Sequence, residues 1–479
     1  MQPQSDRRWV LIVIAVVIAD VTASFESMMV VATLKALFKE FRDPAGVGWM
    51  VTAYLLVAAV AATLCARLGD LFGRKRMILL VLAAAAAGSL LSATHTELEW
   101  VIAGRALQGV SAAVFPLSYG VLRSHLPEER IATAGGFLMA SNSVGAIAGL
   151  MIGGLIVDHF DWRAVFMTSA VVAILTVGVA WLWLPAEPAR RGPANLDILG
   201  GVLFAPAIAG LLLVISKASV WGASDPRTIG IAVGSFALLA WWVHHERNHP
   251  DPLLDVRLLA RKDIALSNIV MLLVAVGPLQ LTIVMMLLLQ QSPATGIGLG
   301  MTASAAAALK LPANFGSFIT APVAGRFCRS AGERPVMELG ILMNIAAWIM
   351  LFFVHDNVWL VFVAVLLSTI GTTIAYVAVA NRITFAAPAG RTSEANGVSI
   401  AVRAVGNACG AQVVALLIGG AVLSEQKAGA ATLAPAGYYM TFGFILCFSI
   451  AALAAARALS GGTGGRSEPA PGAAAPAES

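Results

Sequence analysis

The chain has 479 residues, of which 59% are hydrophobic and only 12% are charged. Soluble domains carry about 25% charged residues, so this composition excludes an ordinary soluble enzyme, a disordered chain and a small disulfide scaffold. The net charge of +5 comes from basic residues spread over short connections, whereas nucleic-acid binding needs them gathered on one face.

Apolar windows of about 20 residues, the length that crosses a bilayer, predict an all-α polytopic membrane protein with fourteen transmembrane helices. In chain order the windows lie near 9–33, 46–66, 77–95, 99–122, 132–157, 164–184, 197–217, 228–244, 264–289, 301–324, 336–354, 357–381, 396–422 and 437–458. The first window is too long for a signal peptide and has no cleavage pattern, so we expect a retained helix.

The Lys and Arg residues predict an orientation. If the N-terminus is inside, most of them fall in alternate connections on the inner side, among them Arg7, Arg8 and the run at 74–76. Cytoplasmic loops are enriched in these residues. We therefore expect a multi-pass protein of the cell (inner or plasma) membrane with both termini in the cytoplasm.

Two stretches of the sequence recur at nearly the same spacing. ARLGDLFGRKR at 66–76 returns as GRFCRSAGERP at 325–335, and VGAIAG at 144–149 returns as VGNACG at 405–410. This repetition predicts two pseudo-symmetric six-helix bundles with two inserted helices between them. The predicted units are 1–186, 187–255, 256–459 and a flexible cytoplasmic tail at 460–479. Halves related in this way commonly hold the substrate site at their interface.

These stretches carry a family resemblance. The loop at 66–76 resembles the hallmark loop of the major facilitator superfamily, and ESMMVVATL, WMVTAYLL, RALQG and PLLDVRLL are similar to segments of its fourteen-helix drug–proton antiporter branch. The resemblance implies an alternating-access transporter, usually one that exchanges protons for small amphipathic molecules. Leu150 stands where the branch has an export-associated Pro in the fifth helix, which leaves the direction of transport open.

Ionisable residues inside the first bundle are the candidate proton-coupling groups. Each costs about 2.5–3.5 kcal/mol at a helix centre, so such residues face an interior and find partners. Glu26 matches the acidic residue of the branch's first-helix motif and is the expected proton carrier, because desolvation disfavours a charged carboxylate. Asp20 lies about 120° away around the helix and is either a second titrating group or a packing acid. Arg105 resembles a relay arginine of the superfamily, and we expect it to pair with Asp20 or Glu26, with Gln108 orienting the arrangement.

Polar residues of the later helices are the candidate cavity groups. Lys310 has no acid in the neighbouring predicted helices, which favours contact with substrate over a packing pair or a neutral amine. Arg403 is expected to hydrogen-bond between helices. The remaining candidates are Asn142, Gln280, Asn314 and Tyr376.

The loop after the second predicted helix is the candidate gate. Its residues are Asp70, Gly73, Arg74, Lys75 and Arg76. An acid beside several bases can latch the two bundles through charge-assisted bonds, although the bases alone would also serve as cytoplasmic anchors.

Glycines give the fifth predicted helix a smooth face. They are Gly145, Gly149, Gly153 and Gly154. Small residues spaced by four let helices approach closely, so we expect a packing role or a helix that can slide.

The sequence indicates no enzyme, cofactor or metal site, and protons are the expected coupling ion. HHERNH at 244–249 is interpreted as a solvated loop, and no phosphate-binding loop, nucleophile elbow or H-E-x-x-H motif occurs.

The leading hypothesis is a proton-coupled exporter of small amphipathic compounds that functions as a monomer in the lipid bilayer, without nucleic acid. One alternative is a proton-coupled importer of an anionic metabolite, favoured by Lys310 and the missing Pro. A third hypothesis is a non-transporting membrane scaffold or sensor.

Overall fold

The computed structural model describes residues 4–186, 197–222, 224–250, 252, 256–387, 392–424 and 434–459. Within these ranges the chain is helical and contains no strand, and 13 helices are long and apolar enough to cross a membrane. A further long helix, α12 (Ala303–Ala331), occupies the tenth predicted window. The predicted all-helical membrane fold is therefore confirmed. The predicted tail at 460–479 lies outside the described residues, as do parts of the predicted boundaries at 187 and 255.

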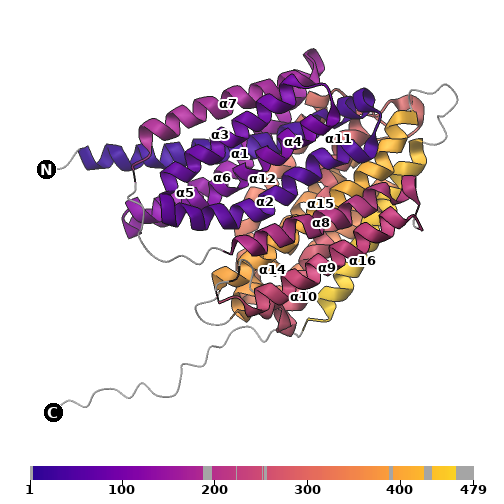
Figure 1. Cartoon of the computed structure of the whole chain (residues 1–479). Helices are drawn as coiled ribbons and strands as arrows, with labels where there is room; N and C mark the ends of the chain where they lie inside the picture. The colour runs from indigo at the N-terminus through magenta and orange to yellow at the C-terminus, as the bar shows by residue number, and fades with distance from the viewer. Residues whose placement is uncertain are drawn as a thin grey trace, which may run out of the picture.

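The first six predicted windows form one group of helices, at the top of Figure 1. These are α1 (Gln4–Phe41), α2 (Pro44–Phe72), α3 (Arg74–Thr94), α4 (Leu98–Gln108), η1 (Gly109–Ala113), α5 (Val114–His125), α6 (Glu128–His159) and α7 (Trp162–Trp183). The first helix is longer than its predicted window and ends at Phe41. The fourth window is interrupted by the 3-10 turn η1, so that α4, η1 and α5 together make one crossing.

The second group begins after two inserted helices. The inserted pair is α8 (Ile198–Trp221) and α9 (Pro226–Asn248). The later helices are η2 (Val256–Ala260), α10 (Lys262–Val276), η3 (Pro278–Gln280), α11 (Leu281–Gln290), η4 (Pro293–Thr295), α12, α13 (Glu333–Phe353), α14 (Val358–Ala386), α15 (Thr392–Ser424) and α16 (Ala434–Arg457). The helix is interrupted between α10 and α11, where Pro278 lies, because proline lacks the N–H that a continuous helix needs.

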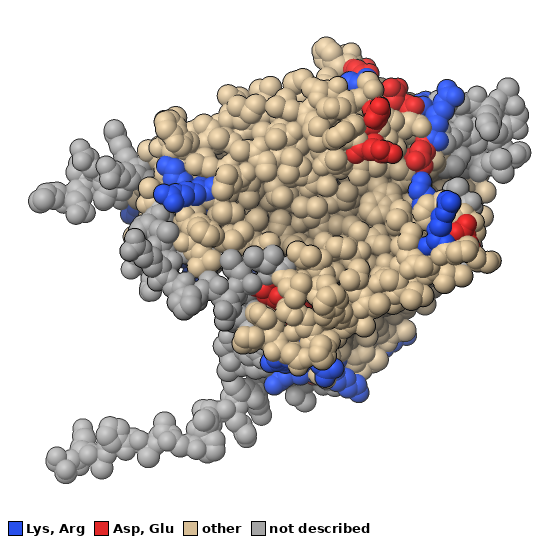
Figure 2. Space-filling view, viewed as in Figure 1, with Lys and Arg blue, Asp and Glu red and all other residues tan. Residues whose placement is uncertain are grey.

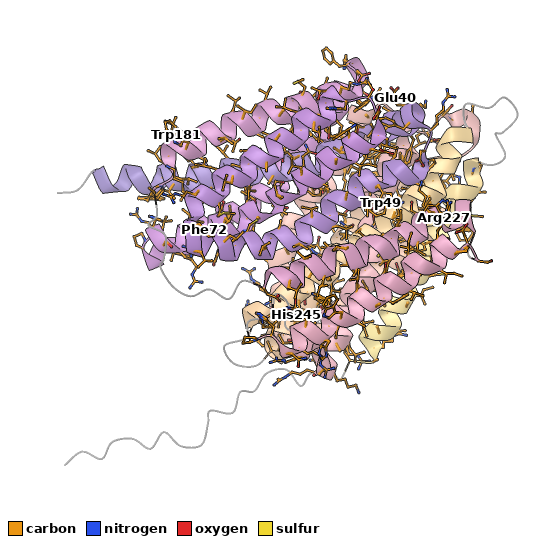
Figure 3. The ribbon with its side chains drawn as sticks, viewed as in Figure 1. Glu40, Trp49, Phe72, Trp181, Arg227 and His245 are labelled. Atoms are coloured by element: carbon orange, nitrogen blue, oxygen red, sulfur yellow. The ribbon has the colours of Figure 1, made fainter. Side chains whose placement is uncertain are left out.

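Charged side chains gather at the two ends of the helix bundle. In Figure 2 the face between these ends is almost free of charge. We call the end that carries Glu40 and Asp43 the α1–α2 end, and the end that carries Arg74 and Arg76 the α2–α3 end. Apolar residues are exposed along the helices, among them Leu175 of α7, and Trp181 in the last turn of α7 points outward (Figure 3) and is 64% exposed. This arrangement suits a bilayer.

The two helix groups repeat the same close packing. A Cβ added at Gly145 or Gly149 of α6 would lie 2.4 or 2.6 Å from the carbonyl oxygens of Val21 and Phe25 in α1. In the second group, Gly406 and Gly410 of α15 would meet the carbonyl oxygens of Leu272 and Val276 in α10 at 3.0 and 2.2 Å. The predicted duplication is confirmed, since the recurring glycines meet equivalent helices.

The recurring loops also adopt one conformation. Gly73 and Gly332 have φ values of 96° and 88°, a region that favours glycine. Two residues after each glycine, a basic side chain caps the last helix of its group: Lys75 Nζ donates to the Leu184 oxygen at 2.5 Å, and Arg334 Nη1 donates to the Leu459 oxygen at 3.1 Å.

The inserted helices pack against the seam between the two groups. α8 contacts both α2 and α15, and Trp49 of α2 donates to the Ser216 hydroxyl of α8 at 3.2 Å. Beyond α8, α9 exposes Ile229, Val233 and Phe236. The pair is therefore an addition to the outside of the bundle rather than a third core.

Polar contacts tie the two groups together at the α1–α2 end. Asp158 of α6 accepts bonds from the Ala303 and Ser304 amides at 2.8 and 2.9 Å and from the Ser304 hydroxyl at 2.5 Å, at the start of α12. Gln412 of α15 donates to the Ala45 oxygen of α2 at 3.1 Å. Lys35 of α1 donates to the Gln290 oxygen of α11. The groups are closed against each other at this end.

Candidate functional site

Glu26 lies in the interior of the first helix group. Its exposed fraction is 0%, and it projects from α1 toward α7, where the Ser169 hydroxyl donates to its Oε1 at 3.1 Å. Its Oε2 is buried and has no hydrogen-bond partner. The carboxylate faces neither lipid nor bulk water.

A chain of hydrogen bonds connects this carboxylate to Arg105. The Ser169 hydroxyl lies 3.0 Å from the Ser89 hydroxyl of α3, and Gln108 of α4 donates from Nε2 to Ser89 at 2.6 Å. Arg105 Nη1 then donates to Gln108 Oε1 at 2.9 Å. We call Glu26, Ser169, Ser89, Gln108 and Arg105 the buried relay. All five side chains have exposed fractions of 1% or less.

Arg105 is held by backbone oxygens rather than by a carboxylate. Its Nε donates to the Met50 oxygen at 3.1 Å, and its Nη1 donates to the backbone oxygen of Glu26 at 3.2 Å. The guanidinium also lies 4.4 Å from the centre of the Tyr54 ring. The prediction that Arg105 pairs with Asp20 or Glu26 when the carboxylate is deprotonated stays a prediction. In this conformation Gln108 and two serines connect the guanidinium to the Glu26 carboxylate.

Asp20 lies outside the buried relay and contacts α6 instead. It is buried, and the Ser141 hydroxyl of α6 donates to its Oδ2 at 2.7 Å. The expected separation of the two carboxylates agrees with this, since Asp20 faces α6 and Glu26 faces α7.

Sequence reasoning missed the two serines that complete the relay. Serines are common in membrane helices, so a single sequence gives no signal that Ser89 and Ser169 lie opposite one another. Their full burial in otherwise apolar helices is evident only when α3 and α7 are packed together.

The cationic candidates of the second group contact uncharged partners. Lys310 of α12 donates to the Thr282 hydroxyl of α11, and no acid pairs with it among the described residues. The Arg403 guanidinium of α15 lies 5.0 Å from the Tyr376 ring centre on α14. The expected hydrogen bond of Arg403 between helices is thus replaced by a cation–π contact between helices.

The remaining cavity candidates do not form one cluster. Gln280 is buried and donates to Asn407 Oδ1 at 2.9 Å, which joins η3 to α15. Asn142 donates to the Ser24 hydroxyl at 2.8 Å within the first group. Asn314 is half-buried on α12, on the other side of the seam.

The gate residues bind within the first group. Arg74 donates to the Gly120 oxygen of α5 at 3.1 Å and to the Ser124 hydroxyl, and Lys75 donates to the Trp181 and Leu184 oxygens at the end of α7. Arg76 is exposed, and the side chain of Asp70 lies outside the described ones. The described bonds of Arg74 and Lys75 therefore join helices of one bundle, whereas the predicted latch would join the two.

The glycine face of α6 divides between two neighbours. Gly145, Gly149 and Gly153 pack against α1, as Gly153 approaches the backbone of Met29. Gly154 instead lies against Ala303 and Ser304 of α12. The prediction of a single face is corrected here, since only three of the four glycines point the same way.

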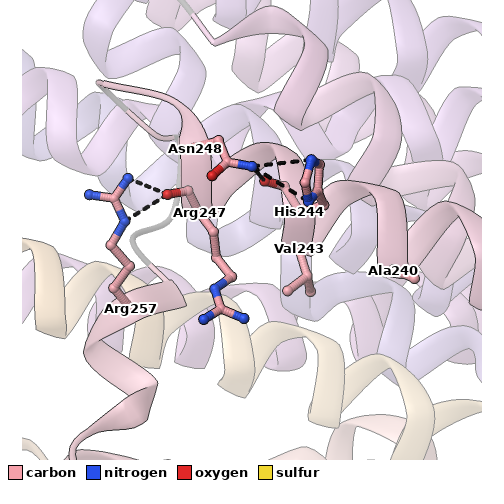
Figure 4. Close-up of a pocket in the computed structure, with 6 residues that line it drawn as sticks. All are labelled: Ala240, Val243, His244, Arg247, Asn248 and Arg257. Atoms are coloured by element: carbon pink, nitrogen blue, oxygen red, sulfur yellow. Dashed lines mark hydrogen bonds between the residues drawn. The ribbon is translucent and has the colours of Figure 1, made fainter.

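Two surface cavities lie away from the buried relay. One, of about 510 Å³, lies beside the last turns of α9 and is lined by Ala240, Val243, His244, Arg247, Asn248 and Arg257 (Figure 4). The other, of about 230 Å³, borders Arg74 and Arg123 at the α2–α3 end.

The fold and the buried charges define a polytopic transporter class, and comparison with known families agrees. Residues 16–411 match the Major Facilitator Superfamily, and the chain belongs to that family. It is a membrane transporter and not an enzyme.

The relatives include one resistance and export protein and several multidrug resistance proteins. The tetracenomycin C resistance and export protein of Streptomyces glaucescens is 25% identical over 85% of this chain and 75% of that protein. The multidrug resistance protein Stp of Mycobacterium tuberculosis is 26% identical over 77% of this chain and 68% of its own length. The multidrug resistance protein B homolog of the same species is 25% identical over 68% of this chain, and the match spans only 60% of that protein.

Solved structures share the fold. A bacterial homolog of the human lysosomal transporter Spinster, in an inward-facing and unoccupied conformation, has a TM-score of 0.66 at 14% identity and covers 95% of this chain and 98% of its own. The peptide transporter POT in complex with sulfate has a TM-score of 0.65 at 14% identity, with the same coverage.

Proposed function

We propose that the protein is a proton-coupled exporter of small amphipathic compounds in the cell membrane, with both termini in the cytoplasm. The observation that carries the proposal is the buried relay, which connects a carboxylate with 0% exposure to a buried arginine through three uncharged side chains. Burying two ionisable groups in a membrane helix bundle is costly and marks functional sites. The similarity to the tetracenomycin C resistance and export protein supports the direction.

In this proposal Glu26 carries the proton. Its deprotonation would leave a charge where no solvent reaches, since both carboxylate oxygens are enclosed. The buried arginine lowers that cost because its positive charge lies at the far end of a short hydrogen-bonded chain. Proton release is therefore expected to accompany a rearrangement of α1 against α7 that admits water.

Alternating closure of the two helix groups would open the relay to each side in turn. Closure at the α1–α2 end rests on the contact between Asp158 and the start of α12. If that end is extracellular, as the distribution of basic residues favours, the conformation described is closed to the outside. Substrate would then enter from the cytoplasmic side.

Lys310 supports the alternative of an importer of anionic metabolites. It lies on α12 near the seam and donates to the neutral hydroxyl of Thr282. An acidic group of a substrate would be a stronger partner for it than this hydroxyl. A Lys310→Ala variant that retains full affinity for acidic compounds would exclude this role.

Substrate-dependent proton movement in proteoliposomes tests the proposal. A panel of toxic amphipathic compounds is first screened by growth of expressing cells, and an active compound is then used with purified protein. We expect Glu26→Gln to reduce substrate-dependent proton flux to the level of protein-free vesicles.

Asp20→Asn is the matched control, because it changes a second buried acid of the same helix that bonds only to Ser141. Proton flux that survives in Glu26→Gln but disappears in Asp20→Asn would contradict the assignment of the carrier.

A further inference from the structure

Residues 244–248 form the end of α9 rather than a loop, so their side chains take defined positions around a helix. α9 continues to Asn248, with His249 as the residue that follows it. His245 and His249 are therefore one helical turn apart. The side chains on this face point toward the start of α8, and His245 is marked near the ends of both inserted helices in Figure 3.

Asp197, the residue before α8, meets this face of α9. His245 Nε2 lies 2.7 Å from Asp197 Oδ1, and the side chain of Asp197 is 0% exposed. The His245 and His249 rings lie 5.2 Å apart. One ligand atom from each of Asp197, His245 and His249 lies within 4.8 Å of the other two.

A second carboxylate lies beside the first. A Cβ at Gly200 would be 2.4 Å from Asp197 Oδ2 and 2.5 Å from Glu246 Oε1, so the two carboxylates share one space next to this glycine. Both Asp197 and Glu246 are buried. Two buried carboxylates at one place attract a divalent cation, and two imidazoles select a transition metal over Mg²⁺ or Ca²⁺.

We propose that Asp197, His245 and His249 form a binding site for a divalent transition metal of the zinc class, with Glu246 or water as the fourth ligand. Ligand atoms on one tetrahedral zinc are about 3.4 Å apart, given bonds of about 2.0–2.1 Å. To reach this spacing, the hydrogen-bonded His245 and Asp197 atoms, now 2.7 Å apart, would separate slightly around the metal, and the half-exposed His249 ring would turn toward them. The site departs from the sequence expectation of no metal, which rested on treating 244–249 as a loop.

The metal would join the two ends of the inserted helix pair. α8 and α9 are already connected at the opposite end by the short turn before Pro226. A bond between the residue before α8 and the last turn of α9 closes the hairpin at its open end. This role is independent of proton coupling, because the buried relay lies in α1, α3, α4 and α7.

Metal titration of the full-length protein tests the site directly. The protein is purified in detergent, its affinity tag is removed, and bound metal is stripped with a chelator. We expect one Zn²⁺ per chain by calorimetry, a melting temperature that rises with zinc concentration, and visible absorption bands of tetrahedral Co²⁺ when cobalt replaces zinc.

Single substitutions separate this site from adventitious binding by surface histidines. We expect His245→Ala and His249→Ala to weaken zinc binding by at least about tenfold. His244→Ala is the control, because His244 lies on another face of α9 beside Asn248 (Figure 4) and should leave the affinity unchanged. His249→Gln removes only the half-exposed ligand and keeps the buried contact, which guards against misfolding.

The proposal is overturned if the stripped wild-type protein binds no stoichiometric zinc. It is equally overturned if His244→Ala weakens binding as much as His249→Gln does. Neither result would affect the proton-coupling proposal, since proton flux with Glu26→Gln is measured separately.

Discussion

The two six-helix groups share their packing but differ in their interiors. In both, glycines of the fifth helix lie against carbonyl oxygens of the first helix of the group, and a glycine with positive φ joins the second and third. When the first helices are matched by these glycine contacts, Gly277 takes the position of Glu26 and Met271 that of Asp20. When the third helices are matched by the recurring loops at 66–76 and 325–335, Trp348 takes the position of Ser89. Trp348 is fully buried, with the Phe442 ring 5.9 Å away.

This difference shows that the fold does not need the buried charges. The second group makes the same helix contacts with a tryptophan and a glycine where the first has a serine and a carboxylate. Because ionisable groups oppose insertion into the membrane, their presence in the first group supports the proposal that they take part in proton coupling.

The largest expected effect on stability lies in the second group. Trp348→Ala should lower the free energy of unfolding by about 3–5 kcal/mol, because it leaves a cavity where a fully buried ring packed. Ser89→Ala at the equivalent position should cost only about 1 kcal/mol but should impair proton flux by interrupting the buried relay. Thermal unfolding and proteoliposome flux of both variants are the measurements. If both variants lose proton flux only in proportion to the stability they lose, the two interiors do not differ in function.

In both groups the close glycine packing should be destabilised by an added methyl group. Gly149→Ala and Gly410→Ala place a Cβ 2.6 and 2.2 Å from carbonyl oxygens, and overpacking of this kind costs about 1–3 kcal/mol. Gly178→Ala on α7 is the control, because nothing lies within 4 Å of its Cβ position. If all three variants melt at the same temperature, the close approach of α6 to α1 and of α15 to α10 is not a source of stability.

Asp158 should control closure at the α1–α2 end. Asp158→Asn replaces charge-assisted bonds, which contribute about 1.5–3 kcal/mol each, with weaker bonds to a neutral amide. We expect a net change of about 1 kcal/mol and greater labelling of a cysteine introduced at Ser304. Asp161→Asn is the control, since Asp161 is exposed and caps α7. Unchanged labelling in Asp158→Asn would show that closure rests on apolar packing.

The smallest effects are expected at the paired caps. Lys75→Ala and Arg334→Ala each remove a cation from a helix C-terminus, which costs about 0.3–1 kcal/mol. Similar small losses in melting temperature would extend the symmetry of the two groups to their loops. A large loss at Lys75 alone would indicate that the first loop has a function that its counterpart lacks.

Much of this arrangement could be predicted from the sequence. Apolar windows indicate the helices because a membrane span has a fixed minimum length, and the recurring VGAIAG and VGNACG segments indicate the duplication. Glu26 and Arg105 could be identified as candidate site residues because charge inside an apolar helix is rare, and Gln108 because it lies three residues after Arg105 in RALQG. The resemblance to the antiporter branch added their expected roles.

Contacts between distant helices could not be predicted. Asp158 bonds to Ser304 and Asp197 to His245, and neither pair has a local pattern that connects it. The same holds for Ser89 and Ser169, whose importance depends on how α3 meets α7. The 3-10 turn at η1 is a further example, since its Gly109 packs against the backbone oxygen of Tyr54 in α2, a contact that the local sequence does not indicate.

Infrared difference spectroscopy of the purified transporter tests the central claim most directly, because it detects the protonation of a buried carboxyl group without a transport assay. Addition of substrate should change a carboxyl C=O band that is absent in Glu26→Gln and retained in Asp20→Asn. A substrate-induced band that persists unchanged in Glu26→Gln would show that another group carries the proton.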